Sequence, residues 1–300
     1  MSIEHEMLEE KVKRLPQLIK KQWIKKLGRV AFAVTVYSIV IVLNQDLLIF
    51  PGAVKSLFYR SNYSAPPEVK EHFLATTEGY NLNIWELAAK QEEPIKKKKV
   101  AVIFHGNGGD MRKFFEFQKW FYLQGYSSYD FDYRGYGKST GWMSEKRIYQ
   151  DAETVLRFIS EREKLSADSI LIMGISIGSG PAAYTAQLFK SKTLLLISGY
   201  SSIPDVVKTR PIYNFLVPFL RYEFPTSAYL ENLKNSSVVI VHGKKDTVIP
   251  HENSLRLKES ASKHNTVHFI SSDTGGHNDT FWEKNAEIVQ ELLKLTQKNG

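Results

Sequence analysis

Three residues that lie far apart in the sequence have the types needed for nucleophilic catalysis. Ser176 is the central residue of the segment GISIG (174–178), and Asp246 and His277 follow it along the chain. A serine hydroxyl is a weak nucleophile near neutral pH, so it needs an imidazole to accept its proton and a carboxylate to orient that imidazole. We therefore interpret Ser176 as a candidate nucleophile, His277 as its candidate base and Asp246 as the carboxylate partner.

The sequence around Ser176 predicts a strand, a sharp turn and a helix. An apolar run at residues 170–173 ends at Gly174, and a helix-like segment follows Pro181. In the pattern GxSxG the serine occupies a strained turn, and the glycines let neighbouring backbone pass closely. The alternative is an ordinary strand-to-helix turn, with Gly and Ser chosen only for turn geometry. The flanking strand and helix signals favour the nucleophile.

Both candidate partners of Ser176 follow predicted strands. Asp246 ends the segment HGKKD after the strand predicted at 238–241, and His277 lies in GGHND after the strand predicted at 266–270. The carboxyl ends of parallel strands meet at one edge of a sheet, where catalytic groups gather. Asp246 taken alone is better explained as a residue that binds the backbone of its own turn. The chain order Ser, Asp, His favours the catalytic interpretation.

His277 is one of eight histidines, and its position distinguishes it from the others. It stands beside glycines, at the carboxyl end of a predicted strand and before a predicted helix, whereas His105 and His242 occupy similar ends in loops with other roles. His264 and His268 have the spacing of a metal-binding pair only on a helix, and a strand is predicted there. We expect neither a metal nor a cofactor.

The negative charge that develops on a reacting carbonyl oxygen requires fixed N–H donors. The backbone N–H of Ile177, directly after the candidate nucleophile, is the first candidate donor. The second is expected from the loop HGNGG (105–109), at Asn107 with Gly108 as the alternative. A phosphate-binding loop is the competing interpretation, but the loop matches neither GxxxxGK[ST] nor GxGxxG.

The order of strands and helices predicts an α/β fold with a mostly parallel sheet covered by helices on both faces. An opening hairpin is expected from 69–75 and 82–87, and strand and helix signals then alternate to the C-terminus. Residues 199–235 interrupt this alternation and are expected to form short helices over the sheet edge. The predicted elements are strands at 100–104, 126–131, 170–173, 193–197, 238–241 and 266–270, and helices at 145–162, 251–261 and 281–295.

The N-terminal part of the chain differs in composition from the rest. Residues 1–29 are basic and 30–50 form a predominantly apolar segment, predicted to be a transmembrane or anchor helix, while 51–300 form the predicted catalytic domain. A cleaved signal peptide and a core or interfacial helix are the alternatives. Under the positive-inside rule, the basic residues predict a cytoplasmic N-terminus and a catalytic domain on the opposite side of the membrane.

The net charge of +8 does not by itself indicate nucleic-acid binding. Residues 1–29 hold eight Lys or Arg against four Glu, so half of the excess lies in a tenth of the chain, and no nucleic-acid motif accompanies it. The chain has no cysteine, which excludes a disulfide framework, a thiolate metal site and a cysteine nucleophile. We therefore expect no nucleic-acid partner.

Taken together, five motifs carry a resemblance to a known family. They are HGNGG (105–109), DYRGYGKSTG (132–141), GISIGSGPA (174–182), HGKKDTVIP (242–250) and GGHND (275–279). This set resembles the α/β-hydrolase superfamily, and specifically its Bem46-like group. The resemblance implies the α/β-hydrolase fold, with nucleophile, acid and base at Ser176, Asp246 and His277. Ile175 and Ile177 depart from the family pattern, in which a bulkier polar residue and Leu are usual; this could alter how substrate fits.

The leading hypothesis from the sequence is a membrane-anchored serine hydrolase that cleaves carboxylic esters or thioesters through an acyl-enzyme. Its expected substrate is a small-molecule or acylated ester or thioester. The first alternative is an acyltransferase that uses the same three residues, with an alcohol or amine replacing water. The second alternative is a non-catalytic binding module on the hydrolase scaffold, which is disfavoured because such modules usually lose one of the three residues.

Overall fold

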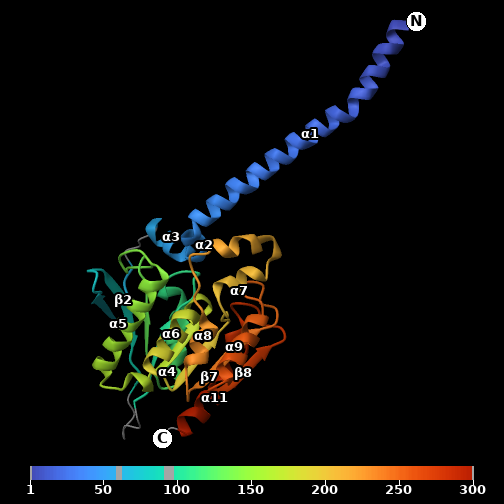
Figure 1. Cartoon of the computed structure of the whole chain (residues 1–300). Coiled ribbons are helices and arrows are strands. Elements are labelled where there is room, and N and C mark those ends of the chain that lie inside the picture. Colours follow the sequence, from blue (N-terminus) through green and yellow to red (C-terminus); the bar gives the residue numbers. More distant parts are fainter. Residues whose placement is uncertain (1, 59–62, 91–97, 299–300) are drawn as a thin grey trace. The chain divides into compact units, whose positions relative to one another are not determined.

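The computed structural model of the chain describes residues 2–58, 63–90 and 98–298 (Figure 1). It consists of two compact units, Met1–Leu48 and Ile49–Gly300. The larger unit holds all eight strands of the sheet and every residue of the candidate site.

The N-terminal unit is almost entirely helical. Helix α1 runs from Ser2 to Leu43, and the short helix α2 (Gln45–Ile49) follows it. The segment Lys20–Leu43 has a mean hydropathy of 1.8 and is long and apolar enough to cross a membrane. A signal sequence near the N-terminus meets the same requirement of length and composition.

The larger unit is built on one sheet with the strand order β1-β2-β4-β3-β5-β6-β7-β8. Strands β1 and β2 form the predicted antiparallel hairpin, β2 pairs antiparallel with β4, and every pairing from β4 to β8 is parallel. The predicted mostly parallel sheet is therefore confirmed. The strands are β1 (Lys70–Ala75), β2 (Asn81–Leu87), β3 (Val100–Phe104), β4 (Ser127–Phe131), β5 (Leu171–Ile175), β6 (Thr193–Ile197), β7 (Ser237–Gly243) and β8 (Thr266–Ser272).

Helices cover both faces of the sheet, and alternate strand residues point to opposite layers. In β3, Val102 and Phe104 join the core beneath α5 (Glu145–Glu163), α6 (Ser179–Phe189) and α9 (Glu252–Ser262). Ala101 and Ile103 point the other way, toward α4 (Phe115–Leu123) and α11 (Asn285–Lys298). Because both faces are buried, the central strands β3, β5 and β6 are largely apolar, which explains why they are readable from the sequence.

The segment between β6 and β7 contains three short helices, as expected for residues 199–235. They are α7 (Ile203–Lys208), η4 (Pro211–Phe219) and α8 (Thr226–Asn232). The C-terminal helix differs from the prediction, since it is divided into α10 (Thr280–Glu283) and α11 (Asn285–Lys298). Phe281 of α10 and Ile288 of α11 nevertheless pack into the same core layer. The sequence pattern predicts a single helix here because α10 and α11 both present apolar residues to one face.

Candidate active site

Ser176 lies at the turn between β5 and α6, in a backbone conformation that non-glycine residues rarely adopt. Its φ is 53°, and a short 3-10 helix, η3 (Ser176–Gly178), leads directly into α6. The two glycines of the segment are required by close packing. A Cβ on Gly174 would lie 2.6 Å from the Cβ of Ala182, and one on Gly178 would collide with the carbonyl oxygen of Phe104. The GISIG pattern thus allows the serine to sit at a tight, strained turn.

The structure brings Ser176, His277 and Asp246 together at the carboxyl edge of the sheet. The Oγ of Ser176 lies 2.9 Å from Nε2 of His277, and Nδ1 of His277 lies 2.7 Å from Oδ2 of Asp246. These residues are 101 and 31 positions apart in the chain. All three sequence-predicted residues therefore form one continuous line of hydrogen bonds from hydroxyl to carboxylate.

The hydrogen bonds determine which nitrogen of His277 carries the proton. A carboxylate only accepts hydrogen bonds, so Nδ1 of His277 must donate to Asp246. Nε2 of the neutral ring is then an acceptor facing the hydroxyl of Ser176. The Asp246 side chain is fully buried, whereas the side chain of His277 is 13% exposed. The imidazole can therefore meet a substrate while its carboxylate partner stays shielded from water.

Asp246 is held in its charged form by several donors. Its Oδ1 accepts the backbone N–H groups of Val248 and Ile249, each at 2.8 Å. Burial favours the neutral acid, but hydrogen bonds from His242 and His277 and the Ile249 N–H outweigh it and hold the pKa of Asp246 well below its usual range. The carboxylate is consequently ready to orient and stabilise an imidazolium at neutral pH.

His242, which was expected to lie in a loop with another role, also belongs to this arrangement. Its fully buried Nε2 lies 3.2 Å from Oδ2 of Asp246 and 2.9 Å from the carbonyl oxygen of Ile249. Both neighbours accept hydrogen bonds, so Nε2 carries the proton and is shared between them. The sequence signal for this role is the four-residue spacing of His242 and Asp246 within HGKKD. Strand β7 ends at Gly243, and the turn that follows brings Asp246 back toward His242.

The main chain at His277 is fixed from two sides. The hydroxyl of Ser198, which follows β6, donates to the carbonyl oxygen of His277 at 3.0 Å. The carboxylate of Asp279 accepts the N–H of Gly276, and the hydroxyl of Thr280 donates to the Gly276 carbonyl oxygen, each at 2.5 Å. The imidazole therefore projects from a loop that is tied to the sheet and to α10.

The loop predicted to supply the second N–H donor lies against the turn of Ser176. A Cβ on Gly178 would lie 2.8 Å from the carbonyl oxygen of His105, which places the start of the 105–109 loop beside η3. The side chain of Asn107 is occupied, since its Oδ1 accepts the Tyr136 hydroxyl at 2.6 Å and its Nδ2 donates to the carbonyl oxygen of Ile49. The side chain thus anchors the loop, which leaves the backbone N–H groups of Asn107 and Gly108 as the candidates.

Ile177 follows Ser176 in η3 and is buried. Because it is among the first residues of a helix, its backbone N–H has no acceptor in a preceding turn. Together with the 105–109 loop it forms the candidate oxyanion hole. Among the residues that the structure describes, no group of three or more His, Cys, Asp or Glu is arranged to hold a metal ion.

Comparison with known proteins relates the chain to α/β-hydrolases. The family model described as serine aminopeptidase, S33 (Hydrolase_4) matches residues 95–239, which include Ser176 and the 105–109 loop but end before Asp246 and His277. Protein bem46 of Schizosaccharomyces pombe is 27% identical over 237 residues, covering 76% of this chain and 78% of its own length.

Two further relatives extend the comparison. The human α/β-hydrolase domain-containing protein 17B is 30% identical over 178 residues, and the match covers 56% of this chain and 58% of that protein. Among solved structures, the esterase Pf2001 of Pyrococcus furiosus superposes with a TM-score of 0.63 at 19% identity, covering 80% of this chain and 95% of the esterase. At that identity the likeness shows the fold alone.

Proposed function

The chain belongs to the α/β-hydrolases of the Bem46-like group, and from this premise we propose that it is a serine hydrolase that cleaves carboxylic esters or thioesters. The family and the fold support hydrolase activity without specifying the bond that is cleaved. The single observation that carries the finer proposal is the line of hydrogen bonds from Ser176 through His277 to Asp246, at 2.9 and 2.7 Å.

In the proposed reaction, Nε2 of His277 takes the proton of the Ser176 hydroxyl while Oγ forms a bond to the substrate carbonyl carbon. The carbonyl oxygen becomes an oxyanion, which accepts the N–H of Ile177 and one N–H of the 105–109 loop. Collapse of this intermediate breaks the bond to the leaving group, and the imidazolium returns its proton to the departing alcohol or thiol. Water then attacks the acyl-enzyme by the same steps, which releases the acid and restores Ser176.

Asp246 acts through His277 and does not touch the substrate. Its buried negative charge favours the imidazolium that forms in each half of the reaction. His242 acts one step further away, because its N–H helps to hold the carboxylate oxygen that His277 uses. Both are positioning residues.

The family description provides a second candidate, a serine aminopeptidase that attacks an amide bond with the same residues. The nucleophile and base would act in the same way, but the leaving group would be an amine. Ester and peptide substrates offered to the same preparation separate the two. An acyltransferase remains the alternative in which an alcohol or amine acceptor replaces water, and product analysis with acceptors present distinguishes it.

The first unit is proposed to anchor the hydrolase to a membrane. The segment Lys20–Leu43 is long and apolar enough to span a bilayer. The eight basic residues within the first 29 favour a cytoplasmic N-terminus, with the hydrolase unit on the opposite side. Protease protection of the hydrolase unit in sealed vesicles tests this orientation, since digestion from the cytoplasmic side would reverse it.

Labelling by a fluorophosphonate probe tests the central proposal. The folded protein is expected to form an adduct at Ser176 and to hydrolyse short p-nitrophenyl esters, and Ser176→Ala is expected to lose both. Hydrolysis by Ser176→Ala at the parental rate would refute the assignment. An intact parental protein that neither labels nor hydrolyses any ester, thioester or peptide would instead support a binding module.

A further inference from the structure

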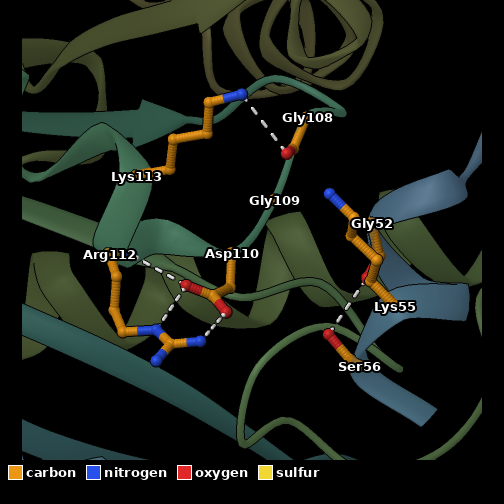
Figure 2. Close-up of a pocket in the computed structure, with 8 residues that line it drawn as sticks. All are labelled: Gly52, Lys55, Ser56, Gly108, Gly109, Asp110, Arg112 and Lys113. Atoms are coloured by element: carbon orange, nitrogen blue, oxygen red, sulfur yellow. Dashed lines mark hydrogen bonds and ion pairs between the residues drawn. The ribbon is translucent and has the colours of Figure 1, made fainter. Parts of the chain in front are cut away.

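A pocket of about 490 Å³ lies beside the candidate oxyanion loop, residues 105–109. Figure 2 shows that residues of α3 (Pro51–Phe58) face the turn at Gly108–Asp110, with the short helix η1 (Met111–Phe114) on its other side. The lining residues are Gly52, Lys55, Ser56, Gly108, Gly109, Asp110, Arg112 and Lys113. One wall of the pocket is therefore the same backbone that carries the candidate oxyanion donors.

The charges around this pocket do not cancel. Both carboxylate oxygens of Asp110 accept hydrogen bonds from the guanidinium group of Arg112. Its Nε lies 2.8 Å from Oδ1, and its Nη2 lies 2.7 Å from Oδ2. Burial opposes the charged form of Asp110, but the hydrogen bonds and charge of Arg112 outweigh it and lower the pKa of that carboxyl. The pair is consequently neutral as a whole, which leaves the two ammonium groups of Lys55 and Lys113 as the net charge of the lining.

Neither lysine has a carboxylate partner within 4.0 Å among the residues that the structure describes. Lys113 makes one hydrogen bond, to the carbonyl oxygen of Gly108 at 3.3 Å, so two of its three N–H groups remain for another acceptor. Exposed lysines are usually just solvated. These two differ because they face one concave space from separate elements, one in α3 and one in η1 (Figure 2).

The glycines of the loop are what bring Lys113 into the pocket. A Cβ on Gly108 would lie 2.6 Å from Nζ of Lys113, so any other residue here would displace the ammonium group. Gly52 has a corresponding role in α3, because a Cβ there would lie 2.8 Å from the carbonyl oxygen of Asn107. The close approach of α3 to the loop therefore sets both the width of the pocket and its distance from the oxyanion donors.

From this arrangement we propose that the pocket binds an anionic group, a carboxylate or a phosphate, carried by the substrate whose carbonyl occupies the oxyanion hole. This inference rests on the proposed function and narrows its substrate class to anionic esters or thioesters. Lys55 and Lys113 supply the charge, and the Arg112–Asp110 pair keeps the η1 side of the pocket in place. The chemistry is that of a cationic pocket for an oxyanion, recognised by ammonium donors.

The kinetic test compares substrates of matched length that differ in charge. Mono-p-nitrophenyl glutarate carries a free carboxylate, and p-nitrophenyl valerate is its neutral counterpart; a 1-acyl-glycerol 3-phosphate and the corresponding monoacylglycerol form the phosphate pair. The parental protein is expected to prefer the anionic member of at least one pair by about tenfold in kcat/KM, the size expected of one or two partly solvated charge contacts. The pair that shows the preference identifies the source of the anion.

Lys55→Gln tests the pocket most cleanly, because Lys55 makes no hydrogen bond to the oxyanion loop in the structure, whereas Lys113 does. The selectivity ratio is expected to fall by about fivefold to tenfold in Lys55→Gln and to invert in Lys55→Glu. Lys146→Gln is the matched control, since Lys146 is an exposed lysine on α5 that is not part of this pocket. An unchanged ratio in both Lys55 variants, with parental melting temperatures, would overturn the proposal.

A binding measurement separates this proposal from the proposed function. Ser176→Ala protein is titrated with inorganic phosphate and with glutarate, and stabilisation against thermal unfolding is followed. A rise in melting temperature that Lys55→Glu abolishes supports the pocket even if no ester is ever hydrolysed. Absence of any shift, together with equal hydrolysis of neutral and anionic esters, would leave a hydrolase standing and remove the anion pocket.

Discussion

Two of the histidine–carboxylate pairs at the carboxyl edge of the sheet have opposite surroundings. In the pair of His277 and Asp246, the imidazole is partly exposed and its second nitrogen faces the hydroxyl of Ser176. In the pair of His105 and Asp132, both side chains are fully buried and their nearest atoms are 3.5 Å apart. Only the first pair can reach a substrate.

The surroundings of His105 explain what it does instead. Its ring packs against Phe114, Tyr133 and Tyr136, with ring centroids 5.3, 4.4 and 5.5 Å away, and its Nδ1 lies 2.9 Å from the carbonyl oxygen of Gly106. Burial disfavours the imidazolium, but a hydrogen bond donated to Asp132 and the charges of Asp130 and Asp132 raise the pKa of His105. A histidine enclosed in this way packs at the start of the 105–109 loop and cannot act as a base toward substrate.

Residue type and position at the sheet edge are therefore not enough to identify a catalytic base. What distinguishes the two histidines is the partner of the second ring nitrogen and the access of that nitrogen to solvent. For His277 the partner is a hydroxyl at a strained turn. The predictions below test this distinction, beginning with the largest expected effect.

Removal of the Asp246 carboxylate should have the largest consequence. In Asp246→Asn the amide can present an N–H toward His277 and favour the wrong tautomer, so kcat is expected to fall by about 10³- to 10⁴-fold. Steady-state hydrolysis of a p-nitrophenyl ester measures this. A loss of less than tenfold in a folded variant would show that His277 does not depend on Asp246.

The same variant has a stability signature with a definite sign. Because the pKa of Asp246 is lower in the folded state than the ordinary value of about 3.9, its charge stabilises the fold above that pH, and the stabilisation is lost as pH falls through the folded value. The difference in unfolding free energy between parent and Asp246→Asn should therefore stay constant from pH 7 down to about pH 5 and shrink from there toward pH 3. A difference that stays constant down to pH 3 would contradict the pKa shift.

His242 should matter for activity through Asp246 alone. His242→Ala removes an N–H that lies 3.2 Å from the carboxylate, a hydrogen bond to a charged group worth about 1.5–3 kcal/mol. We expect kcat to fall by about 10- to 100-fold, much less than in Asp246→Asn, with a larger effect on kcat than on KM. His242→Gln, whose amide can replace the donor, should recover part of the loss; an equal loss in both variants would indicate a purely structural role.

His105→Ala should affect stability more than chemistry. Emptying a ring-sized space among three aromatic rings in the core is expected to lower the unfolding free energy by about 2–4 kcal/mol, measured by urea denaturation. At a temperature where the variant is folded, its loss of kcat should be far smaller than that of His277→Ala. Equal losses in the two folded variants would erase the distinction drawn above.

Asp130 offers an effect on stability alone, and one that depends on pH. Burial raises the pKa of Asp130 to about 8, helped by the charges of Asp132 and Asp110 and only partly offset by the charge of His105 and the N–H of Phe131. Between the unfolded value of about 3.9 and this value, the folded state retains a proton that the unfolded state releases, so stability falls by up to about 1.4 kcal/mol per pH unit as pH rises. Asn cannot ionise, so the stability of Asp130→Asn relative to the parent should increase from pH 5 to pH 8. Parallel stability profiles would contradict the shift.

Much of the fold was predictable because local patterns agree with the global arrangement. The predicted bounds of β3 and β6 match the structure residue for residue, since each is a five-residue run that is apolar and buried at every position except Thr193. The division of the last helix was not predictable, because α10 and α11 bury apolar residues in the same layer across the break. The strand order was not readable either, since each buried run is compatible with any central place in a parallel sheet.

The sequence alone identified the candidate catalytic residues and the places where the chain turns around them. The GISIG segment, the HGKKD turn and the GGHND loop are local, and their spacing relative to strands is enough to place each at a sheet edge. Tertiary structure alone decided that Asp246 is shared between His277 and His242, that His105 is enclosed, and that α3 completes a cationic pocket. These features depend on distances of a few ångströms between segments far apart in the chain, which packing sets and local pattern does not record.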